Sequence, residues 1–425
     1  MFTNTYLPHV SGVAHSVETF RDDLRTRGHE VQVVCPTFEG ATESTASVLR
    51  VPAIQNFNGS DFSVRIPLPG AISRRLHEFA PELIHAHHPF LLGDAALRAA
   101  RESGRPLVFT HHTRYENYTH YVPVDQERFR QFVIRLGTDY ANLCDQVIAP
   151  SESLAELLRR RGVESPITVI PTGVDLARFA GGKRRRIRQA LGIPLGSKVV
   201  GHLGRLAPEK NLDYLADASA RYLCHDPGGE SACLMVGSGP AERTIETIFE
   251  KWGVADRLFM AGKLTGQEVV DAYAAMDLFA FASKNETQGM VLAEAMAAGK
   301  PVIALDAPGA REVVYSAEVG RLVAADADAE RFAAALAEFP LAGAAYHRHA
   351  EAARQGARRF SRERCSRRLA RVYEQLDRYA RPAVGDEQHT AWDSLLARLQ
   401  TEWELLAAKT HALMAAAERK PRSKR

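Results

Sequence analysis

The sequence predicts an α/β fold with two domains, each built on a parallel β-sheet. Short apolar runs rich in β-branched residues alternate with helical patterns up to about residue 340. This alternation stops once, over residues 172–198, and then restarts. The 425 residues also exceed the size at which a single hydrophobic core usually stops growing. We therefore expect domains at 1–172 and 173–360, a helix at 361–382 returning toward the first domain, and a helical, basic extension at 383–425.

Each domain contributes its own series of strands. In the first half, strands are expected at 31–36, 84–87, 107–110, 146–150 and 167–171, with the end of another at 1–3 and a helix at 13–27 that stops at Gly28. In the second half they are expected at 199–203, 232–236, 258–261, 278–282, 302–305 and 321–323. The glycines, prolines and basic run of 172–198 indicate turns and a linker. Open α/β sheets bind ligands beyond the carboxyl ends of their strands, so we expect the chemistry in a cleft between the two domains.

The composition is that of a globular protein without membrane spans. Hydrophobic residues make up 45% and charged residues 25%, and no apolar run approaches the roughly 20 residues that cross a bilayer. The five cysteines form no C-x-x-C pair, and the first residues lack the features of a secretory signal. We expect a cytoplasmic protein with reduced thiols and no nucleic-acid partner.

Basic residues gather in the C-terminal part. Residues 348–371 hold nine arginines against two glutamates, and 419–425 hold five basic residues. These residues either form a solvated helix face and tail or hold an anionic membrane surface, which would make the protein peripheral on the inner face of the membrane.

An amphipathic helix is expected over 390–418. Its apolar residues recur at helical spacing: Trp392, Leu395, Leu396, Leu399, Trp403 and Leu406. It packs either on the body, on a second subunit, or on a membrane, and the oligomeric state stays open.

The most informative stretch is NETQGMVLAEAMAAGKPV at 285–302. Gly289 precedes a helix that begins near Met290, and the free N–H groups of a helix start suit a phosphate. Glu286 lies in the loop before this helix and Glu294 in its second turn. One carboxylate can therefore meet sugar hydroxyls while the other meets a ribose.

This stretch resembles the E-x7-E motif of retaining glycosyltransferases of family 4, enzymes of the GT-B fold with two facing Rossmann-like domains. The resemblance extends over roughly residues 1–380. It implies that Glu286 contacts the transferred sugar and that Gly289, Met290 and Val291 offer backbone N–H groups to the distal phosphate. It implies that Glu294 binds the ribose.

A second motif of that family follows the strand at 199–203. The run Gly204 to Asn211, GRLAPEKN, resembles its G-R-L-x-x-x-K-N loop. Arginine offers a planar fork and lysine a mobile point charge, and a diphosphate leaving group needs both. We assign Arg205 and Lys210 to the donor diphosphate.

Two further turns of the second domain match the family. Gly237, in the turn V-G-S-G-P, is expected to shape the cleft and approach the donor. Lys263 lies in the segment AGKL, where the family recognises the base, so it is expected beside the nucleotide.

The first domain carries looser matches. Gly12 lies in PHVSGV, which resembles a glycine-rich loop, with Ser11 in place of the first glycine. His112, in FTHHTRYENYTHY, matches a family histidine beside the transferred sugar; a core histidine is the alternative. The run HAHHP at 85–89 suggests a metal site, but no carboxylate or cysteine cluster accompanies it. We expect no metal and no cofactor.

The resemblance is strongest to enzymes that glycosylate diacylglycerol or related lipids. It implies transfer of glucose or another hexose from a UDP-sugar to a lipid acceptor with retention of configuration. Arg128, Arg130 and Arg135 interleave with apolar residues, which indicates either a basic amphipathic helix at a membrane or a helix packed on the core. The alternatives are another acceptor, a sugar-nucleotide epimerase, a glycosidase that uses Glu286 and Glu294 as its acid and base, and a non-catalytic sugar-nucleotide-binding protein.

Overall fold

The computed structural model describes residues 1–9, 11–38, 40–41, 43–54, 64–65, 71–117, 126–226, 228–377 and 391–418. The chain forms two compact units. The first comprises residues 1–173 and 365–425, and the second comprises residues 174–364. Parts of the motifs at 8–13 and 109–121, the helix breakers Pro382 and Gly385, and the basic run 419–425 lie outside the described residues.

The first unit is built on parallel strands. The strands β5 (Ile84–Ala86), β6 (Leu107–Thr110), β7 (Gln146–Ala149) and β8 (Ile167–Val169) form one sheet in that order, and β1 (Val33–Pro36) pairs with β2 (Val48–Val51). Phe2 links the two groups because its backbone bridges Val34 and Ala86 in parallel. The expected strands at 31–36, 84–87, 107–110, 146–150 and 167–171 are thereby confirmed, whereas β2 and the short antiparallel pair β3 (Ala53–Ile54) and β4 (Val64–Arg65) were not predicted.

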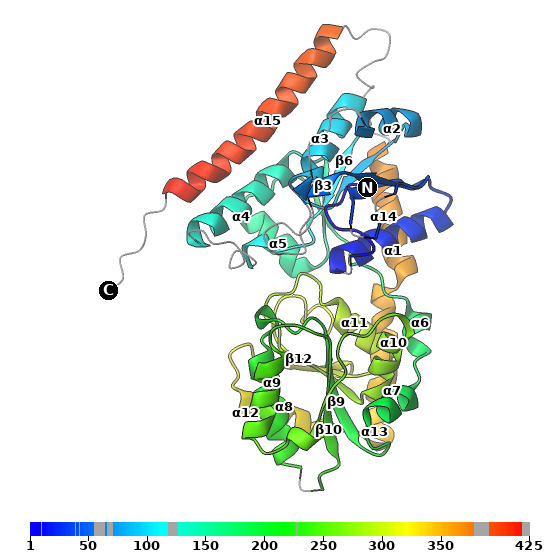
Figure 1. Ribbon diagram of the computed structural model, residues 1–425, viewed down its shortest axis with the longest axis vertical. Coiled ribbons are helices and arrows are strands. Elements are labelled where there is room, and N and C mark those ends of the chain that lie inside the picture. The colour runs from blue at the N-terminus through cyan, green and yellow to red at the C-terminus, as the bar shows by residue number, and fades with distance from the viewer. Residues whose placement is uncertain are drawn as a thin grey trace. The chain divides into compact units, whose positions relative to one another are not determined.

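Helices cover this sheet. They are α1 (Gly12–Thr26), α2 (Ala71–Phe79), α3 (Leu92–Ser103), α4 (Gln126–Asn142), α5 (Glu152–Arg160) and the part of α14 (Arg362–Asp377) from Cys365 onward. The helix predicted at 13–27 is confirmed as α1, and Gly28 adopts a φ of +89° just beyond its end. The last helix, α15 (Ala391–Glu418), lies along α4 and α3 (Figure 1).

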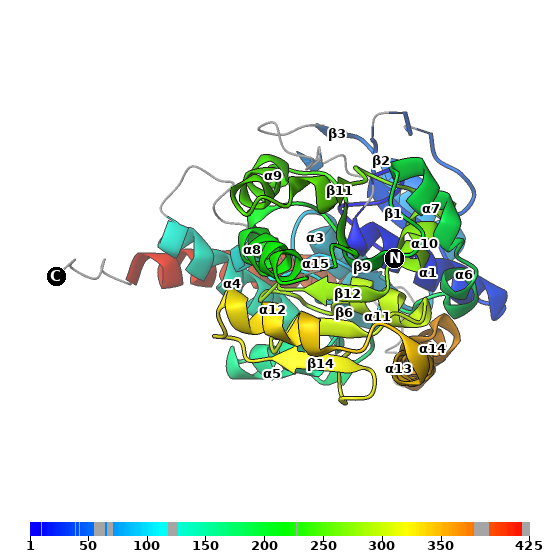
Figure 2. The ribbon, with the colours of Figure 1, turned by 90° about the horizontal axis from the view of Figure 1, so that it is seen from below.

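The second unit has one six-stranded parallel sheet (Figure 2). Its strands are β9 (Lys198–Leu203), β10 (Ser231–Val236), β11 (Leu258–Met260), β12 (Leu278–Phe281), β13 (Val302–Leu305) and β14 (Gly320–Val323). They lie in the order β11-β10-β9-β12-β13-β14, and all six were predicted. The chain order reverses between β9 and β12, which is the switch point where open α/β sheets bind ligands.

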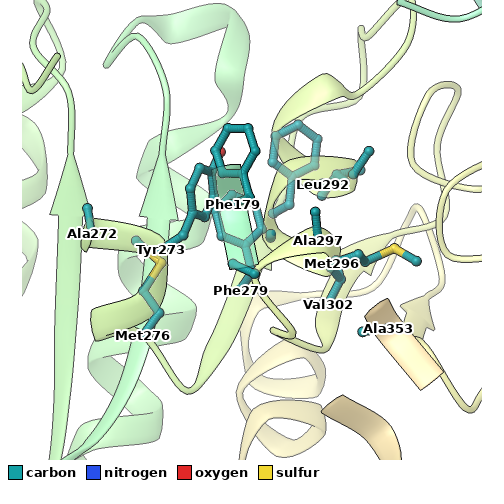
Figure 3. Packing of buried hydrophobic residues seen from close by; sticks show 14 of the residues in the cluster. Phe179, Ala272, Tyr273, Met276, Phe279, Leu292, Met296, Ala297, Val302 and Ala353 are labelled. Atoms are coloured by element: carbon teal, nitrogen blue, oxygen red, sulfur yellow. The ribbon is translucent and has the colours of Figure 1, made fainter. Parts of the chain in front are cut away.

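Two hydrophobic cores pack against the two faces of this sheet. One includes α6 (Leu176–Ala180), α7 (Arg184–Leu191), α10 (Gly266–Ala275), α11 (Met290–Ala297) and α13 (Gly343–Ala357). The other includes α8 (Leu212–Cys224), α9 (Glu242–Lys251) and α12 (Ala329–Glu338). In the first core the rings of Phe179 and Tyr273 meet edge to face, with centroids 5.5 Å apart, near Leu292 and Met296 of α11 (Figure 3).

The expectation that 172–198 is a linker was wrong. The segment folds into α6 and α7, and the basic run that suggested solvent exposure begins α7. Arg188 is fully buried and donates hydrogen bonds to the Asp277 carboxylate at 2.9 Å and to the carbonyl oxygen of Ser197 at 2.8 Å. Its neighbour Arg184 also pairs with Asp277. Because the acidic partner is about 90 residues away in sequence, local composition could not reveal a folded segment.

The arginine-rich stretch at 348–371 lies in α13 and α14. Some of these arginines are engaged by the protein: Arg368 donates to the carbonyl oxygen of Val169 at 2.5 Å, and Arg359 lies over the ring of Tyr315. Among the described helices, none is long and apolar enough to cross a membrane.

Candidate active site

The two loops at the switch point are tied to each other. The loop after β9 ends in a 3-10 turn at Pro208–Lys210, and the next residue, Asn211, adopts a left-handed conformation with a φ of +56°. The Asn211 side-chain amide donates to the carbonyl oxygen of Ala282, directly after β12, at 3.1 Å. This bond fixes the loop of Lys210 against the loop of Glu286.

Lys210 and Glu286 form an ion pair at this point. Lys210 Nζ lies 2.7 Å from Glu286 Oε1, and both side chains are mostly buried. Burial alone would raise the pKa of Glu286, but the charge and hydrogen bond of Lys210 outweigh it, so the pKa of this carboxyl lies below its usual value. The pair therefore presents a fixed anion and a fixed cation where the sequence predicted a sugar and a diphosphate.

Arg205 lies five residues before Lys210 in the same loop. Its side chain is 50% exposed and forms an ion pair with Glu209, whose side chain is nearly buried. An exposed guanidinium can turn toward an anionic ligand at small cost in desolvation, so Arg205 can add a planar pair of donors to the charge of Lys210.

The start of α11 lies close to the loop of Gly309. Gly289 is the N-cap of α11 with a φ of +72°, and a Cβ there would lie 2.8 Å from the carbonyl oxygen of Gly309. Met290 and Val291 are the first two residues of α11. The first N–H groups of a helix have no partner within it and carry its positive dipole end, so this helix start can bind a phosphate.

Glu294 is held by a tyrosine from another helix. Tyr273 Oη of α10 donates to Glu294 Oε2 at 2.7 Å, and the Tyr273 ring packs in the same core as Leu292 and Met296 of α11 (Figure 3). Burial raises the pKa of Glu294 to about 7, although the hydrogen bond from Tyr273 opposes the shift. This carboxyl therefore changes charge near neutral pH.

Gly237 supports the loop of Arg205 from the neighbouring strand. A Cβ at Gly237 would lie 1.8 Å from the carbonyl oxygen of Gly204, and its φ of +136° disfavours other residues. Its N–H donates to the carbonyl oxygen of Gly262 at 2.8 Å. Through this bond the turn that carries Gly237 is adjacent to the segment that carries Lys263, whose side chain is exposed.

His202 was not predicted. It lies near the carboxyl end of β9, and its Nδ1 is 3.2 Å from the carbonyl oxygen of Ala280 in β12. Burial lowers the pKa of this imidazole to about 4, so it is neutral beside Lys210 and Glu286. A histidine within an apolar strand gives no local signal; only the position next to GRLAPEKN could have indicated it.

In the first unit, the half-buried His112 contacts a cluster of buried histidines. His112 Nε2 lies 2.8 Å from His87 Nδ1, and the two rings stack with centroids 5.1 Å apart. His85 contacts Tyr373 Oη through Nδ1 and Thr110 Oγ1 through Nε2. Burial lowers the pKa of His112 to about 3, so it is neutral at physiological pH. His112 can therefore donate or accept one hydrogen bond, but it cannot supply a positive charge.

The described residues include no group of three or more histidine, cysteine, aspartate or glutamate side chains placed to hold a metal ion.

Gly12 is the first residue of α1, and Ser11 caps this helix by accepting from the N–H of Ala14 at 3.1 Å. Among the described residues, a Cβ added to Gly12 would meet nothing within 4 Å.

Two units, each built on parallel strands covered by helices, are the architecture of the GT-B fold. Residues 10–178 match the model of Glycosyltransferase Family 4, and residues 183–356 match the model of Glycosyl transferases group 1. The chain belongs to the family 4 glycosyltransferases.

Curated relatives agree with this membership, and a solved structure shares the fold. The α-monoglucosyldiacylglycerol synthase of Streptococcus pneumoniae is 30% identical over 76% of this chain and 74% of its own length. A GDP-mannose-dependent α-mannosyltransferase of Mycobacterium tuberculosis is 30% identical over 75% of this chain and 82% of its own. Anabaena HepE, solved in complex with UDP, shares the fold with a TM-score of 0.69 at 22% identity, covering 88% of this chain and 99% of its own.

Proposed function

We propose that this glycosyltransferase moves a hexose, glucose in the first instance, from a UDP-sugar to a lipid acceptor with retention of configuration. The observation that carries the proposal is the Lys210–Glu286 pair beside the start of α11 at the switch point of the second unit. A cation, a helix start and a carboxylate together provide sites for a diphosphate and a sugar.

In the proposed reaction the sugar–phosphate bond breaks as the acceptor hydroxyl forms its bond on the same face of the sugar. Negative charge develops on the departing diphosphate, and Lys210, Arg205 and the N–H groups of Met290 and Val291 stabilise it. The leaving diphosphate takes the proton of the incoming hydroxyl, so no side chain acts as a nucleophile. Glu286 orients the sugar hydroxyls and Glu294 the ribose.

Two observations support a lipid acceptor. The relative from Streptococcus pneumoniae is named for glucosyldiacylglycerol synthesis. In α4, Arg128 and Arg130 are exposed beside the half-buried Phe129, which suits a helix at a lipid surface. If α4 binds anionic vesicles, binding falls as salt is added, and salt-insensitive binding contradicts this part of the proposal.

A second donor is supported by the relative from Mycobacterium tuberculosis, which is named for dependence on GDP-mannose. The segment expected to recognise the base exposes Lys263, and one positive charge does not distinguish uracil from guanine. Donor choice is therefore tested directly and not inferred from charge.

The decisive experiment offers the full-length protein UDP-glucose, other UDP-hexoses, GDP-mannose and ADP-glucose, each with and without diacylglycerol vesicles. We expect nucleoside diphosphate release and a new α-glycolipid with UDP-glucose only when vesicles are present. Product from GDP-mannose alone would replace the donor assignment, and product with a soluble acceptor alone would replace the acceptor.

The same assay separates the remaining alternatives. A glycosidase releases sugar from simple glycosides without any nucleotide, and an epimerase interconverts donor sugars without acceptor. A non-catalytic binding protein binds donor without turnover and loses nothing measurable when His112 is changed to alanine.

A further inference from the structure

The outer face of α15 is apolar. Leu399, Trp403, Leu406, Leu413 and Met414 are between 54% and 70% exposed. The side of the helix that packs on α3 and α4 instead carries small or medium residues, of which Thr401, Leu405, Ala408 and Ala412 are buried. The stripe recognised in the sequence, so far as its side chains are described, therefore faces away from the body.

Ion pairs fix this orientation. Arg98 of α3 pairs with Glu402, with Nη2 2.9 Å from Oε2, and Lys409 Nζ lies 2.6 Å from Asp94 Oδ2, also of α3. Both contacts lie on the side of α15 that faces α3. With these pairs made, rotation of α15 to bury Trp403 would break them, so the apolar stripe stays exposed.

The exposed stripe has the spacing of a coiled-coil seam. Leu399, Trp403, Leu406, Thr410 and Leu413 follow one another at intervals of four, three, four and three residues. In the sequence the same alternation extends back to Leu396 and Trp392. From 392 to 413, a span of three heptads, six of these seven positions are apolar and Thr410 is the exception. Such a repeat indicates pairing with another helix and not simple packing on a globular core.

The flanking positions favour an antiparallel partner of the same sequence. If Leu399, Leu406 and Leu413 take d positions, Trp403 and Thr410 take a positions, and Glu402 and Lys409 take g positions. In an antiparallel pair of such helices the a residues lie opposite d residues and g residues lie opposite g residues. Trp403 then packs against Leu406 of the second copy, and Thr410 against Leu399.

In that register Glu402 and Lys409, which keep their pairs with Arg98 and Asp94 of their own chain, also lie opposite Lys409 and Glu402 of the second copy. A parallel pair would instead place Trp403 against Trp403 and Thr410 against Thr410 at the centre. The antiparallel arrangement thus matches a large with a medium residue and a negative with a positive charge, and it is self-complementary as a two-fold interface requires.

A lipid surface fits this helix less well. Helices that lie in the membrane interface carry lysine and arginine along the polar face beside their apolar stripe. Beside the seam of α15 lie Glu402, Gln400, Ala407 and Lys409, without excess positive charge, and the basic run 419–425 lies outside the described residues.

We propose that α15 is a dimerisation helix, which pairs antiparallel with α15 of a second copy of this chain through the seam formed by Leu399, Trp403, Leu406, Thr410 and Leu413. The first unit then forms the subunit interface of a homodimer.

Sedimentation equilibrium of the full-length protein tests this. The wild type is expected to be a dimer at micromolar concentration. Trp403→Glu and Leu406→Glu should each raise the dimer dissociation constant at least tenfold, because each buries a charge in the seam. Leu195→Glu, which changes an exposed leucine of the second unit, is the matched control and should leave the dimer intact. Unchanged far-ultraviolet circular dichroism verifies that the variants fold.

Disulfide cross-linking tests the orientation. In a background where the exposed Cys224 is changed to serine, a mixture of Trp403→Cys and Leu406→Cys chains should form the heterodimeric disulfide. Trp403→Cys alone should cross-link poorly; efficient self-linking would show a parallel pair and overturn the proposed register. A wild-type monomer, a dimer unaffected by both glutamate variants, or a monomer that binds anionic vesicles through Trp403 would overturn the proposal.

Discussion

At the scale of single residues, we expect the Lys210–Glu286 pair to be essential for activity. The Lys198–Glu230 ion pair, away from the proposed site, should be dispensable. Lys210→Ala and Glu286→Ala should each lower kcat/KM by about tenfold or more, about 1.4 kcal/mol in barrier, because each removes a contact to the proposed donor. Lys198 and Glu230 form a more exposed ion pair, 3.3 Å long, at the amino ends of β9 and β10. Lys198→Ala and Glu230→Ala are the controls. Near-normal rates in both donor-site variants would defeat the assignment.

The charge of Glu294 should make donor binding depend on pH. Its pKa of about 7 means that the carboxyl is mostly protonated at pH 6 and ionised at pH 8. Ribose hydroxyls donate more strongly to the anion, so the dissociation constant for UDP should fall as pH rises through 7. Titration calorimetry at several pH values measures this dependence.

Two variants identify the group responsible. Tyr273→Phe removes a hydrogen bond that lowers the pKa of Glu294, so the midpoint should move to higher pH. Glu294→Gln should bind UDP more weakly and without this pH dependence. A midpoint that Tyr273→Phe leaves unchanged would assign the titration to another group.

At the scale of elements, the turn after β10 should determine the position of the loop after β9. Gly237→Ala places a methyl group where the backbone of Gly204 already lies, so we expect a loss of roughly 1–3 kcal/mol in stability and weaker UDP binding. Gly12→Ala, where the added methyl meets open space, should leave stability nearly unchanged. Urea unfolding of both variants provides the comparison, and equal stabilities would contradict the proposed close packing.

The helix α7 depends on the burial of Arg188. Arg188→Ala leaves Asp277 without its fully buried partner, although Arg184 remains, so we expect a loss of about 3–5 kcal/mol. Arg185→Ala, on the exposed side of the same helix, should cost less than about 0.5 kcal/mol. Chemical denaturation distinguishes the two, and a small effect of Arg188→Ala would mean that α7 does not depend on this pair.

At the scale of the whole molecule, the two units have separate cores, so they can unfold in separate transitions. The charged residues proposed to contact the sugar-nucleotide donor, Arg205, Lys210, Glu286 and Glu294, all lie in the second unit. UDP at about 100 times its dissociation constant should therefore stabilise that unit by about 2.7 kcal/mol and shift one calorimetric transition. In Lys210→Ala the shift should shrink at the same UDP concentration; an undiminished shift would place the nucleotide elsewhere.

The sequence by itself determined the two parallel-sheet units, all six strands of the second sheet and the family, because alternating apolar runs and motifs such as GRLAPEKN are local in the chain. It also indicated Lys210, Glu286 and Glu294 as site residues. Only the tertiary structure showed that Lys210 contacts Glu286, that Tyr273 holds Glu294, that His202 lies beside them, and that 172–198 is folded around Arg188. It also revealed which face of α15 is uncovered. These features depend on contacts between residues far apart in sequence, and spacing along one chain does not encode which distant side chains meet.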